Sequence, residues 1–160
     1  MNTALILAGG LDPRFHMDIP KQFVNVNNKP VIIYTLEIFQ NHPDIDEIIV
    51  TCLDGWQEMV RVYGKQFNIT KLKEIIPGGK DAQESTYHGL QLLKDRMGAG
   101  DIVVVHDAIR PMVSEELITD SIKVCRKKGM GVAATYIMDT IMHSPDGKEG
   151  YQSINRYEIM

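Results

Sequence analysis

The sequence is poor in cysteine and has no long hydrophobic run. Its 160 residues include two cysteines, Cys52 and Cys125, which lie far apart and match no metal-binding spacing. Each stands in an apolar pattern, which favours a buried reduced thiol. No apolar run approaches the ~18–20 residues of a membrane span, and Met1-Asn2-Thr3 lacks the charge that opens a secretory signal. We therefore expect a cytoplasmic protein that needs no disulfide and no membrane.

Positive charge is also scarce. Seventeen Lys and Arg residues stand against 21 Asp and Glu residues, for a formal net charge of −4. This balance disfavours nucleic-acid binding, which relies on many cations at phosphates, but it leaves room for a small anionic ligand held by a few local cations. Hydrophobic residues make up 44% and charged residues 24%, as is typical of globular proteins. The length predicts one domain with a sizeable core.

Short apolar runs alternate with segments of helical periodicity. The runs at residues 4–8, 48–53, 72–76 and 102–105 are typical of strands buried on both faces of a parallel sheet, and residues 131–137 predict another strand. Helical spacing occurs at residues 31–40, 56–67, 83–97 and 114–128. The alternation predicts an α/β domain with a mostly parallel sheet.

The end of the sequence has a different pattern. Residues 139–143 and 151–154 flank Ser144-Pro145-Asp146-Gly147, a strong turn signal. We expect a β-hairpin that projects as an arm at about 136–156 from a single domain spanning 1–160. On this arm, Thr140 and Arg156 could clamp a phosphate, or they could be solvent-facing polar residues.

Candidate ligand-binding residues follow the first predicted strand, because open α/β sheets bind ligands at the carboxyl ends of strands. Leu7-Ala8-Gly9-Gly10 comes first, and Arg14 and Lys21 follow. The glycines let the backbone approach phosphates, and the two cations could neutralise a triphosphate. The alternative is an ordinary turn with two surface cations. Neither a Walker A loop nor GxGxxG is present.

The third and fourth predicted strands end in similar signals. Gly78-Gly79 could contact a flat ligand such as a base, or could form an ordinary turn. Asp107 directly follows a buried strand and is well placed to hold Mg²⁺ near phosphates, although it could instead pair with Arg110. We expect His106 to brace this loop rather than act as a general base.

These motifs follow one another in order along the chain: Leu7-Ala8-Gly9-Gly10 with Arg14, Ile19-Pro20-Lys21-Gln22-Phe23, Lys29-Pro30-Val31, His42-Pro43-Asp44-Ile45-Asp46, Gly78-Gly79, Val105-His106-Asp107-Ala108-Ile109-Arg110-Pro111, Asp139-Thr140-Ile141 and Asn155-Arg156. In order and spacing they resemble the sugar-alcohol-phosphate cytidylyltransferases. That group includes the enzymes acting on 2-C-methyl-D-erythritol 4-phosphate and on ribitol 5-phosphate.

The resemblance implies a Rossmann-like nucleotidyltransferase fold that transfers CMP from CTP to a polyol phosphate and releases pyrophosphate. It also implies Mg²⁺ as cofactor and a homodimer formed through the arm. Carried over by position, the catalytic residues would be Arg14 and Lys21, and the metal ligand Asp107. The nucleotide would be bound by Ala8, Gly9, Gly10, Gly79, Lys80 and Ser85, and the polyol phosphate by Arg110, Asp139, Thr140 and Arg156.

The chain departs from the family pattern at three places. Asp12 and His16 stand where family members have glycines, Ala82 stands where Arg or another polar residue is common, and the C-terminal part of the family domain is expected to be absent. We expect 2-C-methyl-D-erythritol 4-phosphate as acceptor, in isoprenoid precursor synthesis. The alternatives are ribitol 5-phosphate as acceptor, or a truncated nucleotide-binding domain without turnover.

Overall fold

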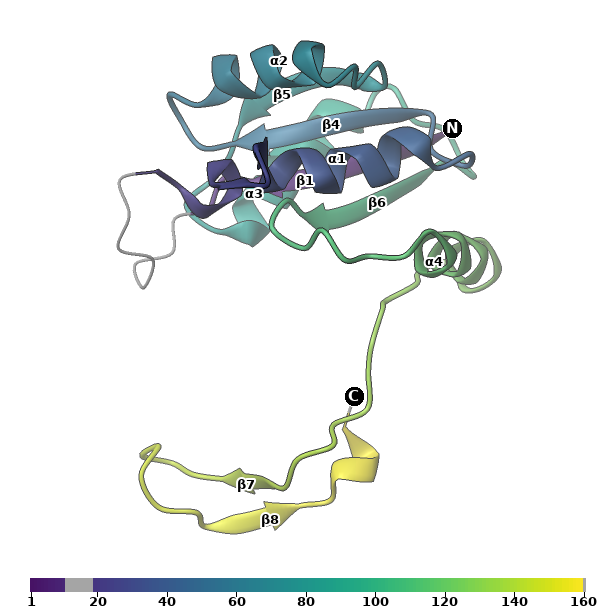
Figure 1. The fold of residues 1–160 in the computed structure, drawn as a ribbon. Coiled ribbons are helices and arrows are strands. Elements are labelled where there is room, and N and C mark those ends of the chain that lie inside the picture. Colours follow the sequence, from purple (N-terminus) through teal and green to yellow (C-terminus); the bar gives the residue numbers. More distant parts are fainter. Residues whose placement is uncertain (11–18, 160) are drawn as a thin grey trace. The chain divides into compact units, whose positions relative to one another are not determined.

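In a computed structural model of the chain, the structure describes residues 1–10 and 19–159. They divide into two compact units, Met1–Met130 and Gly131–Met160, and each unit is described by itself. Figure 1 shows the elements of both units.

The first unit is built on a parallel four-stranded sheet. Its strands are β1 (Asn2–Ala8), β4 (Glu47–Cys52), β5 (Leu72–Pro77) and β6 (Ile102–Asp107), arranged in the order β5-β4-β1-β6 (Figure 1). Each strand falls on one of the four predicted apolar runs, so the predicted α/β class is confirmed. The strand order reverses direction at β1, which places the topological switch point between β1 and β6.

Helices cover both faces of this sheet. They are α1 (Val31–Asn41), α2 (Gln57–Gln66), α3 (Ala82–Leu93) and α4 (Glu115–Lys128). The helices α1, α2 and α4 share one core with β1 and β4, whereas α3 supplies Leu93 to a smaller core on Leu5 and Ile49. A Cβ added at Gly89 of α3 would lie 2.4 Å from Cδ1 of Leu5, so this glycine lets the helix approach β1 closely.

The ends of the elements follow the sequence signals. The Ser114 hydroxyl accepts a hydrogen bond from the N–H of Leu117 at 3.1 Å and caps α4, and Gly129 ends it with φ of 86°. The helix α3 ends at Leu93, short of the predicted end at residue 97. The segment from β1 to α1 includes the 3₁₀ turn η1 (Lys21–Phe23) and the small ladder of β2 (Asn25–Val26) and β3 (Lys29–Pro30).

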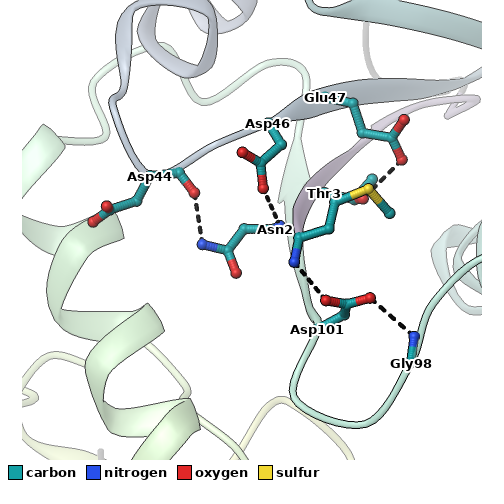
Figure 2. Close-up of polar contacts among 8 residues, drawn as sticks. Asn2, Thr3, Asp44, Asp46, Glu47, Gly98 and Asp101 are labelled. Carbon is teal, nitrogen blue, oxygen red and sulfur yellow. Dashed lines mark hydrogen bonds and ion pairs between the residues drawn. The ribbon is translucent and has the colours of Figure 1, made fainter.

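Polar side chains hold the amino end of β1. The backbone N–H of Asn2 donates to Asp46 Oδ2 at 2.6 Å, and its side-chain amide donates to the backbone oxygen of Asp44 at 2.6 Å (Figure 2). The Thr3 hydroxyl donates to Glu47 Oε1 at 2.9 Å. These bonds join β1 to the segment that enters β4, its neighbour in the sheet.

Asp101 completes this end of the sheet. Its carboxylate accepts hydrogen bonds from the amino group of Met1 at 2.5 Å and from the N–H of Gly98 at 2.9 Å (Figure 2). The bond from the Met1 amino group, aided by the Gly98 N–H, lowers the pKa of Asp101 below its ordinary value. Both hydrogen bonds therefore favour the charged form of the Asp101 carboxylate.

The second unit contains the predicted hairpin. Its strands β7 (Ile141–His143) and β8 (Gln152–Ile154) pair in antiparallel register, and η2 (Arg156–Glu158) follows. Asp146 Oδ1 accepts the backbone N–H groups of Lys148 at 2.9 Å and Glu149 at 3.2 Å, which lowers the pKa of Asp146. Gly147 supplies the left-handed conformation of the turn, with φ of 71°.

The strand predicted at residues 131–137 is wrong. These residues have irregular backbone, and most of them are exposed, with Val132 at 75% and Tyr136 at 71%. A strand persists only where a neighbour completes its hydrogen-bond ladder, and no described strand pairs with this segment. The apolar residues of this segment favour a β-strand, but no described strand pairs with them, so a strand does not form.

Candidate functional site

A cavity lies at the carboxyl ends of β1 and β6, where the strand order of the sheet reverses. It has a volume of about 150 Å³ and is lined by Leu7, Ala8, Gly9, Gly10, Lys21, Gln22, Ala82, Ser85, Asp107 and Ile109. Open α/β sheets bind ligands at this position. The cavity brings together the predicted site residues Ala8, Gly9, Gly10, Lys21, Ser85 and Asp107 from four separate segments of the chain.

The volume limits what this cavity can hold. Ligand pockets commonly measure ~300–1,000 Å³, so about 150 Å³ suits part of a nucleotide, such as a phosphate group, rather than all of it. A larger cavity of about 320 Å³ lies between α2 and β5 and is lined by residues such as Arg61, Lys65 and Lys73. None of the described site residues lies there, and β5 is an edge strand away from the switch point. Position, rather than size, identifies the candidate site.

The glycine loops after β1 and β5 pack directly against each other. A Cβ added at Gly78 would lie 3.1 Å from the Cα of Gly9 and 3.3 Å from the backbone oxygen of Cys52. A Cβ added at Gly9 would lie 3.2 Å from Ser85 Oγ. The sequence left open whether these glycines contact a ligand or form ordinary turns. The structure adds that Gly9 and Gly78 also let two strand ends meet.

Ser85 holds the loop that follows β5. Its side chain is buried, and its Oγ accepts the N–H of Gly79 at 2.9 Å. The N–H of Lys80 donates to Glu84 Oε2 at 2.8 Å, and Asp81 caps α3 by accepting the N–H of Glu84 at 2.8 Å. Both backbone donors of the predicted nucleotide-binding pair Gly79-Lys80 are thus engaged with the first turn of α3. Their role toward a nucleotide stays a prediction.

Asp107 borders the cavity at the last position of β6. Its Oδ2 accepts a hydrogen bond from Nε of Arg110 at 2.7 Å, which is the pairing left open by the sequence. His106 lies with Nε2 at 3.0 Å from the backbone oxygen of Arg110, so its predicted bracing role is confirmed. Across residues 1–10 and 19–159, no three His, Cys, Asp or Glu side chains cluster as a metal site. Among the described residues that line the cavity, Asp107 is the one carboxylate.

The turn η1 brings Lys21 to the border of the same cavity. Its neighbour Gln22 is 1% exposed, and the Gln22 Nε2 donates to the backbone oxygen of Ala8 at 2.8 Å and of Gly10 at 3.3 Å. The sequence reasoning missed Gln22. Its place between Lys21 and Phe23 in the PKQF motif was the only available signal. Arg14, Asp12 and His16 lie outside the described residues.

The remaining predicted substrate ligands belong to the second unit. Asp139 and Thr140 are exposed. The Arg156 guanidinium donates from Nη1 to the backbone oxygen of Met138 at 2.7 Å and lies 5.3 Å from the ring centroid of Tyr157. Arg156 is therefore tied to the segment that directly precedes Asp139-Thr140.

Two further observations concern expectations from composition. Cys52 is fully buried, and this burial raises the pKa of its thiol to about 12, as expected of an unreactive reduced cysteine. Cys125 is only partly buried, so the prediction of a buried thiol is wrong for this residue. Among the described residues, no helix combines the length and the apolar character needed to cross a membrane.

Known proteins resemble the chain along almost all of its length. A family model described as "IspD: 2-C-methyl-D-erythritol 4-phosphate cytidylyltransferase" matches residues 2–156. A ribitol-5-phosphate cytidylyltransferase of Lacticaseibacillus paracasei is 43% identical over 157 residues, which are 98% of this chain and 65% of that protein. A 2-C-methyl-D-erythritol 4-phosphate cytidylyltransferase of Clostridium botulinum strain Okra is 35% identical over 99% of this chain and 68% of its own length. The chain thus spans about two thirds of these relatives.

Solved structures show the same fold. The 2-C-methyl-D-erythritol 4-phosphate cytidylyltransferase of Francisella tularensis matches with a TM-score of 0.73 at 26% identity, covering 97% of this chain and 66% of that chain. The 4-diphosphocytidyl-2C-methyl-D-erythritol synthase of Anaerococcus prevotii matches in fold with a TM-score of 0.77 at 23% identity, covering 99% and 65%. The family match, the relatives and the fold agree with the resemblance in the motifs, and the chain belongs to the 2-C-methyl-D-erythritol 4-phosphate cytidylyltransferase family.

Proposed function

We propose that the protein transfers CMP from CTP to a polyol phosphate and releases pyrophosphate. The observation that carries the proposal is the cavity at the switch point between β1 and β6, in a chain whose family match covers residues 2–156. The cavity is bordered by a lysine, a carboxylate and a glycine loop. A lysine and backbone N–H groups stabilise a triphosphate directly, and a carboxylate would do so by holding Mg²⁺.

The chemistry asks the protein for positioning and charge stabilisation. The phosphate of the acceptor attacks the α-phosphorus of CTP in line, the bond to the leaving pyrophosphate breaks, and no covalent enzyme intermediate forms. Lys21, together with Arg14, would stabilise the charge that develops on the triphosphate. The backbone of Ala8, Gly9 and Gly10 would hold the phosphates close to this lysine.

Asp107 would hold the Mg²⁺ of the CTP complex. Mg²⁺ is bound in such sites by one or two carboxylates together with phosphate oxygens and waters, and Asp107, the carboxylate found among the described lining residues, fits that pattern. The cation would supply charge neutralisation at the triphosphate. Arg110, 2.7 Å from this carboxylate, would keep the Asp107 side chain oriented along the border of the cavity.

The proposal leaves two candidates for the polyol phosphate that accepts CMP. Ribitol 5-phosphate is favoured by the 43% identity to a relative named for it, and 2-C-methyl-D-erythritol 4-phosphate, which would give a role in isoprenoid precursor synthesis, by the family match and a relative at 35%. The acceptor would be bound by Arg110, Asp139, Thr140 and Arg156, of which the two arginines and the Thr140 hydroxyl suit its phosphate. The proposal also includes a cytoplasmic location and a homodimer formed through the arm. Sedimentation velocity would detect the dimer.

The test is pyrophosphate release with CTP and Mg²⁺, run with each acceptor and with none. The proposal expects turnover with one acceptor and none without acceptor. Turnover with ribitol 5-phosphate alone would exclude the methylerythritol acceptor. CTP binding without turnover with either acceptor would identify a nucleotide-binding domain that lacks the transferase reaction. Failure to bind CTP at all would overturn the proposal.

A further inference from the structure

Gln22 is a buried polar side chain that the proposed chemistry does not use. It lies in η1 between Lys21, at the border of the cavity, and Phe23, and it is 1% exposed. Its Nε2 donates to the backbone oxygens of Ala8 at 2.8 Å and Gly10 at 3.3 Å. The carboxamide therefore spans from the turn that carries Lys21 to the glycine loop that follows β1.

The orientation of this carboxamide follows from its acceptors. Two carbonyl oxygens face the same nitrogen, so reversing the amide would place oxygen against both of them. The other end, Oε1, is buried and accepts no hydrogen bond from the part of the chain that the structure describes. An aliphatic side chain of similar size would avoid the cost of this unsatisfied acceptor, so packing alone does not account for a glutamine here.

The turn η1 is also fixed from its other side. The ring of Phe23 stacks on Trp56, with centroids 4.5 Å apart and planes inclined by 12°. Gln22 and Phe23 thus anchor η1 to two different loops at the carboxyl end of the sheet. The position of Lys21 relative to Gly9 and Gly10 depends on both anchors, and Gln22 supplies the one that contacts the glycine loop.

We propose that Gln22 is a positioning residue that holds the Ala8–Gly10 backbone in register with Lys21 for binding the triphosphate of CTP. This inference rests on the proposed function. Its own content is that loss of the two Nε2 hydrogen bonds loosens the glycine loop and weakens CTP binding, while the acceptor phosphate is bound as before.

The variants are Gln22→Leu, which removes both donors at similar size, and Gln22→Glu, which places an oxygen opposite the two carbonyls. Gln40→Leu is the matched control. Gln40 lies in α1, and it also ties a helix to a loop, since its Oε1 accepts the N–H of Lys71 at 2.9 Å and its Nε2 donates to the Thr70 hydroxyl at 3.0 Å. Thermal unfolding curves, recorded by the fluorescence of Trp56, the single tryptophan, are used to choose a temperature at which all variants are folded.

Two readouts are taken at that temperature. Hydrogen exchange of the amides of residues 8–10 without ligand should be faster in both Gln22 variants and unchanged in Gln40→Leu. The KM for CTP, or the Kd from calorimetry with CTP and Mg²⁺, should rise about tenfold in the Gln22 variants, while the KM for the acceptor stays within about twofold. If Gln22 had a purely structural role, its replacement would lower kcat in proportion to the fraction of folded protein and leave the KM for CTP unchanged.

The outcomes separate the inference from the proposed function. Unchanged exchange at residues 8–10 overturns the inference, and so does an unchanged CTP affinity in the Gln22 variants. If the unaltered chain binds CTP without turnover, the Kd values decide the inference although the transferase proposal has failed. If it does not bind CTP, the proposed function and the nucleotide-binding role of Gln22 are both overturned.

Discussion

The two ends of β1 are held by different chemistry. At the amino end, the carboxylates of Asp46 and Glu47 accept hydrogen bonds from Asn2 and Thr3 (Figure 2). At the carboxyl end, no such carboxylate clamp joins the described loops. Gly9 packs on the loop after β5, and the Gln22 carboxamide joins η1 to the backbone oxygens of Ala8 and Gly10. Glycines and a nearby lysine admit an anion, and Asp107, the carboxylate that the structure describes at this cavity, would act in the proposed function by holding Mg²⁺.

Replacing Lys21 should produce the largest effect at the carboxyl end. Lys21→Ala removes a cation from the border of the proposed triphosphate site, and kcat/KM for pyrophosphate release should fall about 10²–10³-fold. The free energy of unfolding, measured in urea, should stay close to that of the unaltered chain. Lys123→Ala, on the exposed face of α4 near Asp120, is the matched control. Full activity in Lys21→Ala would contradict the assignment.

The glycine contact should be the next most sensitive feature. The Cβ of Gly78→Ala would lie 3.1 Å from the Cα of Gly9 and 3.3 Å from a backbone oxygen. Backbone cannot yield as a side-chain tip can, so we expect a loss of about 1–3 kcal/mol in the free energy of unfolding. Gly10→Ala is the control for stability, since no described atom lies within 4 Å of its added Cβ. Equal stability of the two variants would show that the loops have room to separate.

The amino end should affect stability without affecting nucleotide binding. Asp46→Ala removes the acceptor of the Asn2 N–H, a partly buried contact whose loss should cost about 1 kcal/mol. The KM for CTP should not change, because Asp46 lies at the end of the sheet opposite the cavity. Urea denaturation and steady-state kinetics check the two parts separately. A raised KM would mean that the two ends of β1 are coupled.

The smallest effect should come from protonating Asp101. Its pKa is lowered in the folded state by the Met1 amino group and the Gly98 N–H, so its contribution to stability is full above the ordinary value of 3.8 and decreases as the pH falls through the lowered value. Because the group is exposed, the change should be slight. In denaturation curves taken from neutral pH to about pH 3, Asp101→Asn should lose less stability than the unaltered chain. Parallel curves would contradict this.

The sequence predicted the sheet and the helices well because their signals are local. Buried parallel strands need continuous apolar runs, and α4 carries its own caps in Ser114 and Gly129. The strand at 131–137 failed for the opposite reason. Whether an apolar run becomes a strand depends on a neighbouring strand elsewhere in the fold. The sequence of residues 131–137 does not show whether such a neighbouring strand exists.

The candidate site could be predicted in part. Ala8, Gly9, Lys21 and Asp107 were found because ligands bind at strand ends, and their placement around one cavity agrees with that rule. Gln22 could not be found in this way. Its burial depends on how η1 folds back onto the loop after β1, which is a tertiary contact without a local pattern. The packing of Gly9 on Gly78 was missed for the same reason.

The central claim is that the carboxyl ends of β1 and β6 bind the nucleotide. Hydrogen exchange of the full chain, measured with and without CTP and Mg²⁺, tests it most directly. The account predicts slower exchange at residues 8–10, at η1 and at residues 107–109, with no change at Asn2 and Thr3. Protection confined to the cavity between α2 and β5, or to the amino end of β1, would contradict it.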